Sequence, residues 1–202
     1  MSVYVKICGL STGGTVDAAV EAGADAVGFV FAPGSPRTVD AALARSLATP
    51  PGVARVGVVR GQPIDEVLAF AEEAALTTVQ FHGGEPESDL QRAAAAGYDV
   101  IRAVSIDELE AAASAPSHRL LIDAVEPGAG HTFDARRLNP LALPADWLLA
   151  GGLTPDNVAR LLRSSGAAGA DVSSGVESSR GVKDVALIRA FVAAAREAPV
   201  GA

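Results

Sequence analysis

The chain has 202 residues, a formal net charge of −8 and a single cysteine. A chain of this length can bury the core of one domain. Its 24 acidic residues against 16 basic ones exclude the basic face that sequence-independent nucleic-acid binding requires. One cysteine excludes an intrachain disulfide framework and fits a reducing cytosol. We therefore expect a single domain over 1–202, located in the cytoplasm and without a nucleic-acid partner.

No segment indicates export or membrane insertion. The opening MSVYVKICGL lacks a basic region followed by a long apolar stretch, so it does not predict a signal peptide. No run of about 18 apolar residues is present, which is the length that a spanning helix needs. No exposed apolar helix stripe stands out either, and we therefore expect a monomer with no membrane partner.

Short, apolar, β-branched segments alternate with alanine-rich segments that carry charges at helical spacing. The first kind predicts strands at 3–7, 25–31, 54–59, 77–81, 99–104, 119–123, 146–150 and 169–173. The second kind predicts helices at 14–22, 40–47, 63–74, 86–96, 106–113, 134–138, 155–163 and 184–196. Thr154-Pro155 favours a helix start, with Thr as cap and Pro in the first helical position. Eight strand–helix units predict an α/β fold, a closed (β/α)8 TIM barrel, rather than an open doubly wound sheet.

Glycine and serine follow the last two predicted strands. In a barrel of this kind the active site lies at the carboxyl ends of the strands, and the loops after strands seven and eight commonly bind phosphate. Glycine lets the backbone approach an anion, and helix N-termini direct N–H groups at it. We therefore predict a phosphate site; the alternative is that these glycines only make tight turns. Its residues are Gly151, Gly152, Ser173, Ser174 and Gly175.

Cys8 and Asp123 each end a predicted strand. A cysteine is more often a small buried hydrophobe, but strand alternation places Cys8 on the inner face with Tyr4 and Lys6. A thiolate there can abstract a proton if its pKa is lowered. Asp123 is either a structural carboxylate or a general acid beside a bound substrate. Cys8 and Asp123 are the candidate catalytic pair.

Other charged side chains near the strand ends have two interpretations each. Arg37, after Ser35-Pro36, is either a solvated cation or a guanidinium that grips a carboxylate. His82 ends the fourth strand and is a candidate lining residue. With His118 and His131 it is too scattered for metal-ligand spacing, so we expect no metal.

Lys6 is predicted to point into the barrel, where an unpaired charge is costly. Asp171 lies on strand eight, which neighbours strand one in a closed barrel. We hypothesise a Lys6–Asp171 ion pair.

Read together, these segments resemble the phosphoribosylanthranilate isomerase family along nearly the whole chain. The resemblance implies that Cys8 is the general base, that Asp123 is the general acid and that Arg37 contacts the anthranilate carboxylate. It also places Gly128 and Gly130 at the substrate, although Pro127-Gly128-Ala129-Gly130 departs from the family's Gly-Gly-Thr-Gly or Gly-Gly-Ser-Gly loop. The similar segments are Lys6-Ile7-Cys8-Gly9, Gly28-Phe29-Val30-Phe31, Ser35-Pro36-Arg37, Val79-Gln80-Phe81-His82-Gly83, Leu121-Ile122-Asp123, Leu149-Ala150-Gly151-Gly152-Leu153, Asp171-Val172-Ser173-Ser174-Gly175-Val176-Glu177 and Gly181-Val182-Lys183-Asp184.

The resemblance implies an Amadori rearrangement of N-(5-phosphoribosyl)anthranilate to 1-(2-carboxyphenylamino)-1-deoxyribulose 5-phosphate, in tryptophan biosynthesis and without a cofactor. Two alternatives stay open. A histidine-pathway isomerase or dual-substrate relative would share the phosphate loops, but that family carries aspartates at the ends of strands one and five, where this chain has Cys8 and Ala103-Val104. A non-catalytic phosphosugar-binding barrel would not need Cys8.

Overall fold

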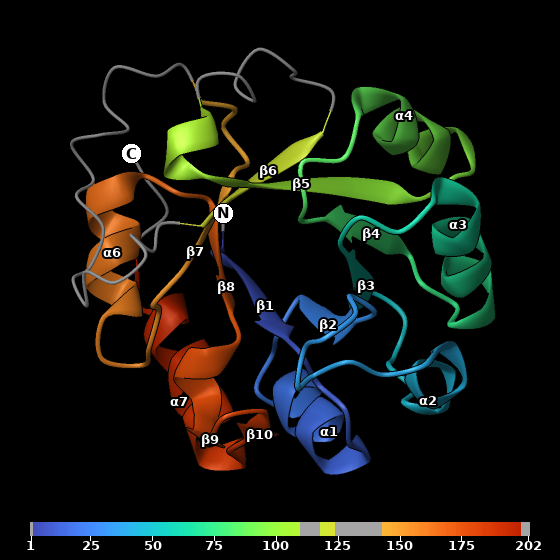
Figure 1. The fold of residues 1–202 in the computed structure, drawn as a ribbon. Coiled ribbons are helices and arrows are strands. Elements are labelled where there is room, and N and C mark those ends of the chain that lie inside the picture. The colour runs from blue at the N-terminus through green and yellow to red at the C-terminus, as the bar shows by residue number, and fades with distance from the viewer. Residues whose placement is uncertain (1, 110–117, 124–142, 199–202) are drawn as a thin grey trace.

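The computed structural model describes residues 2–109, 118–123 and 143–198. Eight parallel strands form one closed barrel in sequence order, and β8 pairs with β1 to close it (Figure 1). This confirms the predicted (β/α)8 barrel, and each strand lies within two residues of its predicted bounds. The strands are β1 Tyr4–Cys8, β2 Ala26–Val30, β3 Ala54–Val59, β4 Thr78–Phe81, β5 Asp99–Ser105, β6 Arg119–Asp123, β7 Leu148–Ala150 and β8 Gly169–Val172.

Helices surround the barrel; most of them connect one strand to the next, and the last helix follows the last strand (Figure 1). They are α1 Gly13–Glu21, α2 Ala41–Ser46, α3 Ile64–Glu73, α4 Glu87–Ala95, α6 Val158–Ser165 and α7 Val185–Arg196. The segment predicted as helix 106–113 begins with the 3-10 turn η1, Ile106–Glu108, and from 110 onward it lies outside the described residues. The helix predicted at 134–138 lies outside them entirely, as do Gly128, Gly130 and His131.

The predicted helix start at Thr154-Pro155 is wrong by three residues, because α6 begins at Val158. The carbonyl of Thr154 accepts the N–H groups of Asn157 and Val158, which makes a turn ahead of the helix. Thr154 donates its own N–H to Asn157 Oδ1 at 2.9 Å, so the asparagine amide closes this turn. Asn157 also donates to the carbonyl of Gly152 at 2.9 Å, which ties the loop after β7 to the helix.

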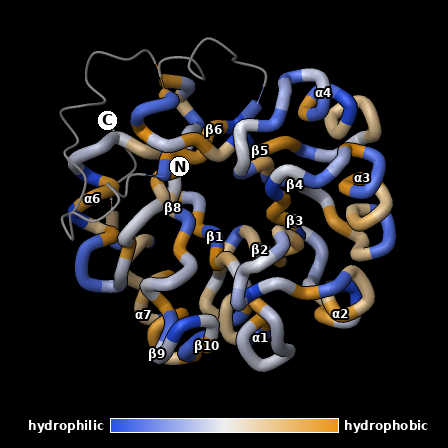
Figure 2. Tube along the Cα trace, in the orientation of Figure 1, coloured by the Kyte–Doolittle hydropathy of each residue, from blue (hydrophilic) through white to orange (hydrophobic). Residues whose placement is uncertain are grey.

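The buried apolar side chains form a large cluster between the strands and the helices and a smaller cluster inside the barrel. Val3, Val5 and Ile7 face outward into the cluster that packs the strands against the helices. Their alternates on β1 face inward, as predicted, and Lys6 is fully buried. In Figure 2 the outer helices, such as α3 and α4, alternate hydrophilic and hydrophobic residues, as expected of helices with one face on the barrel.

A small hairpin follows β8 near the carboxyl end of the barrel. It consists of the 3-10 turn η3, Ser174–Val176, and the antiparallel strands β9, Glu177–Ser179, and β10, Val182–Lys183. The hairpin precedes α7 and contacts the loop after β2 through Glu177 and Gly181. Among the described helices, none combines the length and apolar character needed to cross a membrane.

Candidate active site

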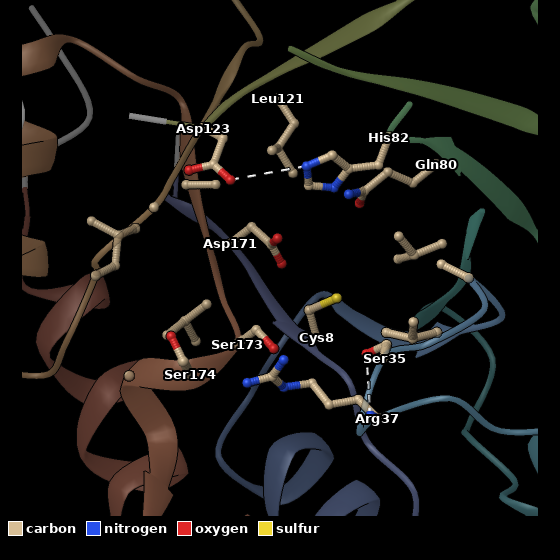
Figure 3. Close-up of a pocket in the computed structure, with 18 of the residues that line it drawn as sticks. Cys8, Ser35, Arg37, Gln80, His82, Leu121, Asp123, Asp171, Ser173 and Ser174 are labelled. Carbon is tan, nitrogen blue, oxygen red and sulfur yellow. Dashed lines mark hydrogen bonds and ion pairs between the residues drawn. The ribbon is translucent and has the colours of Figure 1, made fainter. Parts of the chain in front are cut away.

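A cavity of about 380 Å³ opens at the carboxyl ends of the barrel strands (Figure 3). It brings together every predicted site residue that the structure describes, from β1, β4, β6 and the loops after β2, β7 and β8. The predicted residues that line it are Cys8, Arg37, His82, Asp123, Gly151, Gly152, Ser173, Ser174 and Gly175. The active end predicted from the strand order is therefore a single concave site.

Cys8 ends β1 and points into the cavity with 6% of its surface exposed (Figure 3). Its neighbour in register on β2 is Gly28. A Cβ atom at position 28 would lie 2.9 Å from Cys8 Sγ and 3.1 Å from Cys8 Cα, closer than side chains pack. Gly28 thus leaves the space that the thiol occupies, a role that the sequence pattern did not reveal.

The Lys6–Asp171 pair predicted from the barrel closure is confirmed. Lys6 Nζ lies 2.8 Å from Asp171 Oδ1, and the two residues are in register on β1 and β8. Burial acts to lower the pKa of Lys6, but the Asp171 carboxylate and Cys8 raise it, and the net pKa lies above its usual value. An ammonium ion is therefore held inside the barrel, two residues before Cys8 on the same strand face.

The thiol of Cys8 does not have the lowered pKa that a resting thiolate needs. Burial is the largest effect and raises the pKa of Cys8, the Lys6 and Lys183 ammonium groups lower it, the Asp171 carboxylate raises it, and the net pKa lies above its usual value. The Cys8 thiol therefore holds its proton more firmly than an ordinary cysteine does. A positive charge brought close to the thiol would favour its thiolate form.

Asp123 enters the cavity from β6 and His82 from the end of β4, with His82 Nε2 3.9 Å from Asp123 Oδ2 (Figure 3). Both side chains are partly exposed, at 43% for His82 and 36% for Asp123. Both side chains are therefore accessible to solvent and to a ligand at the cavity mouth. In Figure 3 it lies on the far side of the cavity from Cys8.

The two glycine loops at the cavity edge touch each other. Gly151 and Gly152 both have positive φ, 90° and 60°, which favours glycine in this turn after β7. A Cβ on Gly175 would lie 1.7 Å from the carbonyl oxygen of Leu153, so any side chain there would force the loops after β7 and β8 apart. The backbone of both loops can therefore converge on one small ligand group.

Arg37 lines the cavity but is not an isolated cation. Its Nε and Nη2 donate to Glu177 Oε1 and Oε2 at 2.6 and 2.8 Å. Ser35 Oγ accepts the Arg37 N–H at 3.2 Å within the loop after β2. Glu177 was not singled out from the sequence, because nothing in a lone glutamate at the start of a hairpin indicates a partner 140 residues away.

Three further residues at the site were not predicted. Lys183 lies beneath the loop after β8, where Nζ donates to Ser173 O at 2.8 Å and to Ser173 Oγ at 3.1 Å. Gln80 lines the cavity from β4 and is 1% exposed, and its Oε1 has no hydrogen-bond partner among the described residues. Arg60 lines the cavity from the end of β3. Arg37, Arg60 and Lys183 supply positive charge locally in a protein that is acidic overall.

The described residues contain no group of three or more His, Cys, Asp or Glu side chains arranged to hold a metal ion. His118, placed just before β6, lies 3.0 Å from Glu87 Oε1. Its role is therefore a structural contact with the start of α4.

Comparisons with known proteins give this site its family. A family model described as N-(5'-phosphoribosyl)anthranilate (PRA) isomerase matches residues 5–194. The N-(5'-phosphoribosyl)anthranilate isomerase of Deinococcus radiodurans is 44% identical over 204 residues, covering 96% of this chain and 97% of the relative. TrpF from Jonesia denitrificans superposes with a TM-score of 0.86 at 43% identity, covering 96% of this chain and 97% of that one.

A third comparison links the fold to a ligand. A phosphoribosyl anthranilate isomerase solved in complex with reduced 1-(o-carboxyphenylamino)-1-deoxyribulose 5-phosphate superposes with a TM-score of 0.85 at 35% identity, covering 96% of this chain and 98% of that one. The barrel, the cavity at its carboxyl end and these full-length matches agree. The chain belongs to the N-(5'-phosphoribosyl)anthranilate isomerase family, which carries out an aldose–ketose isomerisation in tryptophan biosynthesis.

Proposed function

We propose that the chain catalyses its family's Amadori rearrangement by general acid–base catalysis, with Cys8 as the base and Asp123 as the acid. The observation that carries the proposal is that both side chains face one cavity, which Arg37 and the loops after β7 and β8 also line (Figure 3). The substrate is N-(5'-phosphoribosyl)anthranilate, and the product is 1-(2-carboxyphenylamino)-1-deoxyribulose 5-phosphate. Each proton transfer contributes about 10²- to 10⁴-fold to the rate.

The reaction needs one proton given and one taken. Asp123 donates a proton to the furanose ring oxygen, the C1′–O bond breaks, and the anilino nitrogen lone pair forms an iminium ion at C1′. Cys8 then removes the C2′ proton, and the electrons of that C–H bond neutralise the iminium to give an enolamine. The enolamine tautomerises to the ketone. The iminium acidifies the C2′ proton, so the chemistry requires no metal, flavin or nicotinamide.

The raised pKa of Cys8 fits this order of events. A neutral thiol is stable in the empty cavity because burial disfavours its charged form. Once the ring has opened, the iminium places a positive charge at the carbon next to the proton to be removed. That charge, together with the buried Lys6 ammonium, favours the thiolate. The thiol then releases its proton to solvent at the cavity mouth, and the thiolate takes the C2′ proton.

Two anchors orient the substrate between the acid and the base. We infer that the loops at Gly151-Gly152 and Ser173-Ser174-Gly175 bind the phosphate, which their close contact and glycine backbone support. Arg37 takes the carboxylate of the anthranilate group, and Gly128 and Gly130 complete the substrate contacts. His82 lines the same cavity, with its Nε2 3.9 Å from Asp123 Oδ2. Holding the substrate by both of its anionic groups keeps C2′ at Cys8.

An anthranilate-fluorescence assay with freshly prepared substrate tests this proposal. The purified protein is compared with Cys8→Ala and Asp123→Asn, and binding of the reduced product analogue is measured in parallel. We expect each variant to lose at least about 10²-fold in turnover while binding the analogue within a few-fold of wild type. Near wild-type turnover in Cys8→Ala refutes the assigned base. Binding without any turnover in the unmodified protein favours the non-catalytic phosphosugar-binding barrel.

We further propose that residues 1–202 act as a single, monomeric isomerase domain in the cytoplasm. Only two large apolar side chains among the described residues are exposed, Leu43 and Val182, which supports a surface without a subunit interface. Light scattering of the purified protein tests the oligomeric state, and fractionation of the source cells tests the location. A dimer mass or a membrane-bound fraction contradicts this part of the proposal.

A further inference from the structure

We propose that Glu177 is a positioning residue that holds the Arg37 guanidinium in one orientation and leaves its other edge for the substrate carboxylate. The inference rests on the proposed function, in which Arg37 takes that carboxylate. Glu177 begins β9 and does not line the cavity, and its side chain is 3% exposed. It therefore acts on the substrate only through Arg37.

The acceptor capacity of Glu177 is filled by the protein itself. Oε1 accepts from Arg37 Nε at 2.6 Å and from Lys183 Nζ at 2.8 Å. Oε2 accepts from Arg37 Nη2 at 2.8 Å and from the N–H of Gly181 at 3.0 Å. A carboxylate offers about four lone-pair sites. With all four in use, both oxygens are fixed in place, and Glu177 has no site left for a ligand.

The guanidinium is only partly used by this contact. Arg37 has five N–H donors, and Glu177 takes one on Nε and one on Nη2. The remaining three, two on Nη1 and one on Nη2, have no acceptor among the described residues. In Figure 3 the guanidinium reaches the cavity beside Ser173 and below Asp171. Its Nη1–Nη2 edge is therefore the edge on which a second carboxylate can bind in the two-point geometry that guanidinium favours.

Two glycines let the surrounding backbone close on this pair. Gly9 follows Cys8 with φ +76°, and a Cβ there would lie 2.7 Å from Arg37 Cδ, so the arginine stem crosses the end of β1. Gly181, with φ +85°, packs against Pro36, where a Cβ would lie 3.3 Å from Pro36 O. The hairpin of β9 and β10 is thus seated on the loop that carries Arg37.

The charge balance of the cluster also favours a positioning role. The hydrogen bonds from Arg37, Lys183 and the Gly181 N–H overcome the effect of burial and lower the pKa of Glu177 to about 2. Glu177 is therefore ionised at any working pH. It neutralises one of its two cationic partners, so the cluster keeps one net positive charge with which to attract an anionic group.

Two stable ligands separate carboxylate recognition from the rest of binding. One is reduced 1-(o-carboxyphenylamino)-1-deoxyribulose 5-phosphate, and the other is the same molecule without its carboxyl group. The ratio of their dissociation constants, which we call the carboxylate preference, is measured by calorimetry. In wild type we expect a preference of roughly 10- to 100-fold, the range given by hydrogen bonds between charged groups.

The variants are Glu177→Gln, Glu177→Asp, Arg37→Gln and, as matched control, Glu87→Gln. Glu87 also joins two basic side chains, Arg102 at 2.8 Å and His118 at 3.0 Å, but does not line the cavity. We expect the carboxylate preference to fall about 10-fold in Glu177→Gln. It also falls in Glu177→Asp, which keeps the charge but cannot span Arg37 and Lys183. The ligand without the carboxyl group binds all variants within about 3-fold, and Glu87→Gln keeps the wild-type preference.

The outcomes distinguish this inference from the proposed function. If Arg37→Gln keeps the carboxylate preference, the proposed role of Arg37 is wrong. If Arg37→Gln loses the preference but Glu177→Gln keeps it, only the positioning role is overturned. A wild-type preference in Glu177→Asp reduces Glu177 to charge neutralisation, and equal weakening of both ligands reduces it to a structural residue. Should Glu177→Gln fail to fold, Glu177→Asp carries the same test, since it keeps the ionised group.

Discussion

Replacing Asp171 with Asn leaves the Lys6 ammonium inside the barrel without its counter-charge. Lys6 is fully buried and its partner lies 2.8 Å away, whereas the side chain of Asp171 is 10% exposed at the cavity wall. Breaking a buried ion pair by removing one partner costs about 3–5 kcal/mol. We expect Asp171→Asn to lose that much free energy of unfolding. Lys6→Met loses less, because the remaining carboxylate is close to cavity water.

The pH dependence of this loss gives a sharper signature than its size. Burial is the largest effect on the pKa of Lys6 and lowers it. Without Asp171, only Cys8 remains to raise it, and we expect the pKa to fall below its ordinary value of 10.5. The unfolded chain then binds a proton that the native variant releases, so the stability of Asp171→Asn rises with pH up to 10.5. Its deficit relative to wild type shrinks by up to about 1.4 kcal/mol per pH unit. Groups that titrate alike in both proteins cancel in the difference.

The free energy of unfolding by urea is measured at several pH values between neutrality and pH 8.5. The proteins compared are wild type, Asp171→Asn, Lys6→Met and the double variant. The double variant, which carries neither charge, should be more stable than Asp171→Asn alone. A loss below about 1 kcal/mol in Asp171→Asn would refute the buried pair. A large but pH-independent deficit would show that another group holds the Lys6 proton.

Three more substitutions test the site. Gly28→Ala puts a methyl group 2.9 Å from Cys8 Sγ and should lower kcat by about 10-fold or more. The control Gly13→Ala, whose Cβ meets nothing within 4 Å, should keep the wild-type kcat. An equal effect of the two substitutions on kcat contradicts the packing argument. Gln80→Met removes a buried acceptor that has no partner among the described residues. Thermal unfolding should therefore show a stability that is unchanged or higher by up to about 1 kcal/mol, while turnover becomes weaker. A loss of stability would mean that Gln80 Oε1 is hydrogen-bonded in the folded protein. Folding lowers the pKa of Glu177 from 4.5 to about 2. Wild type should therefore be more stable than Glu177→Gln by an amount that includes roughly 3 kcal/mol above pH 4.5, and this part disappears as pH falls through about 2. The free energy of unfolding of both proteins, measured across acid pH, checks this, and a difference independent of pH contradicts it.

The barrel and the placement of its central residues could be predicted because both depend on periodicity. Side chains alternate between the two faces of a strand, which predicts that Lys6 and Cys8 on β1 face inward. Closure of the barrel pairs β8 with β1 and places Asp171 beside Lys6. The same order of strands put Asp123 and the glycine loops at one end. The catalytic and binding roles given to these residues stay predictions until the variants are assayed.

Contacts between loops could not be predicted, because no periodic rule sets them. Arg37 and Glu177 meet across 140 residues through a hairpin whose seat on Pro36 depends on a glycine turn. Gly28 matters only through the thiol opposite it. The start of α6 was misplaced because the Asn157 amide, rather than the Thr154 hydroxyl, organises that turn. In each case the deciding interaction is one specific tertiary or local hydrogen bond or close contact.

The central claim, that the thiolate of Cys8 is the base, is tested most directly in Asp123→Asn, in which the proposed acid no longer titrates. Cys8 is the chain's sole cysteine, so the pH dependence of its alkylation by iodoacetamide reports its thiolate alone. We predict that the residual kcat/KM of this variant and the alkylation rate rise together with pH, with a shared pKa above the ordinary 9.0. A residual kcat/KM that stays flat while the alkylation rate rises would contradict the account.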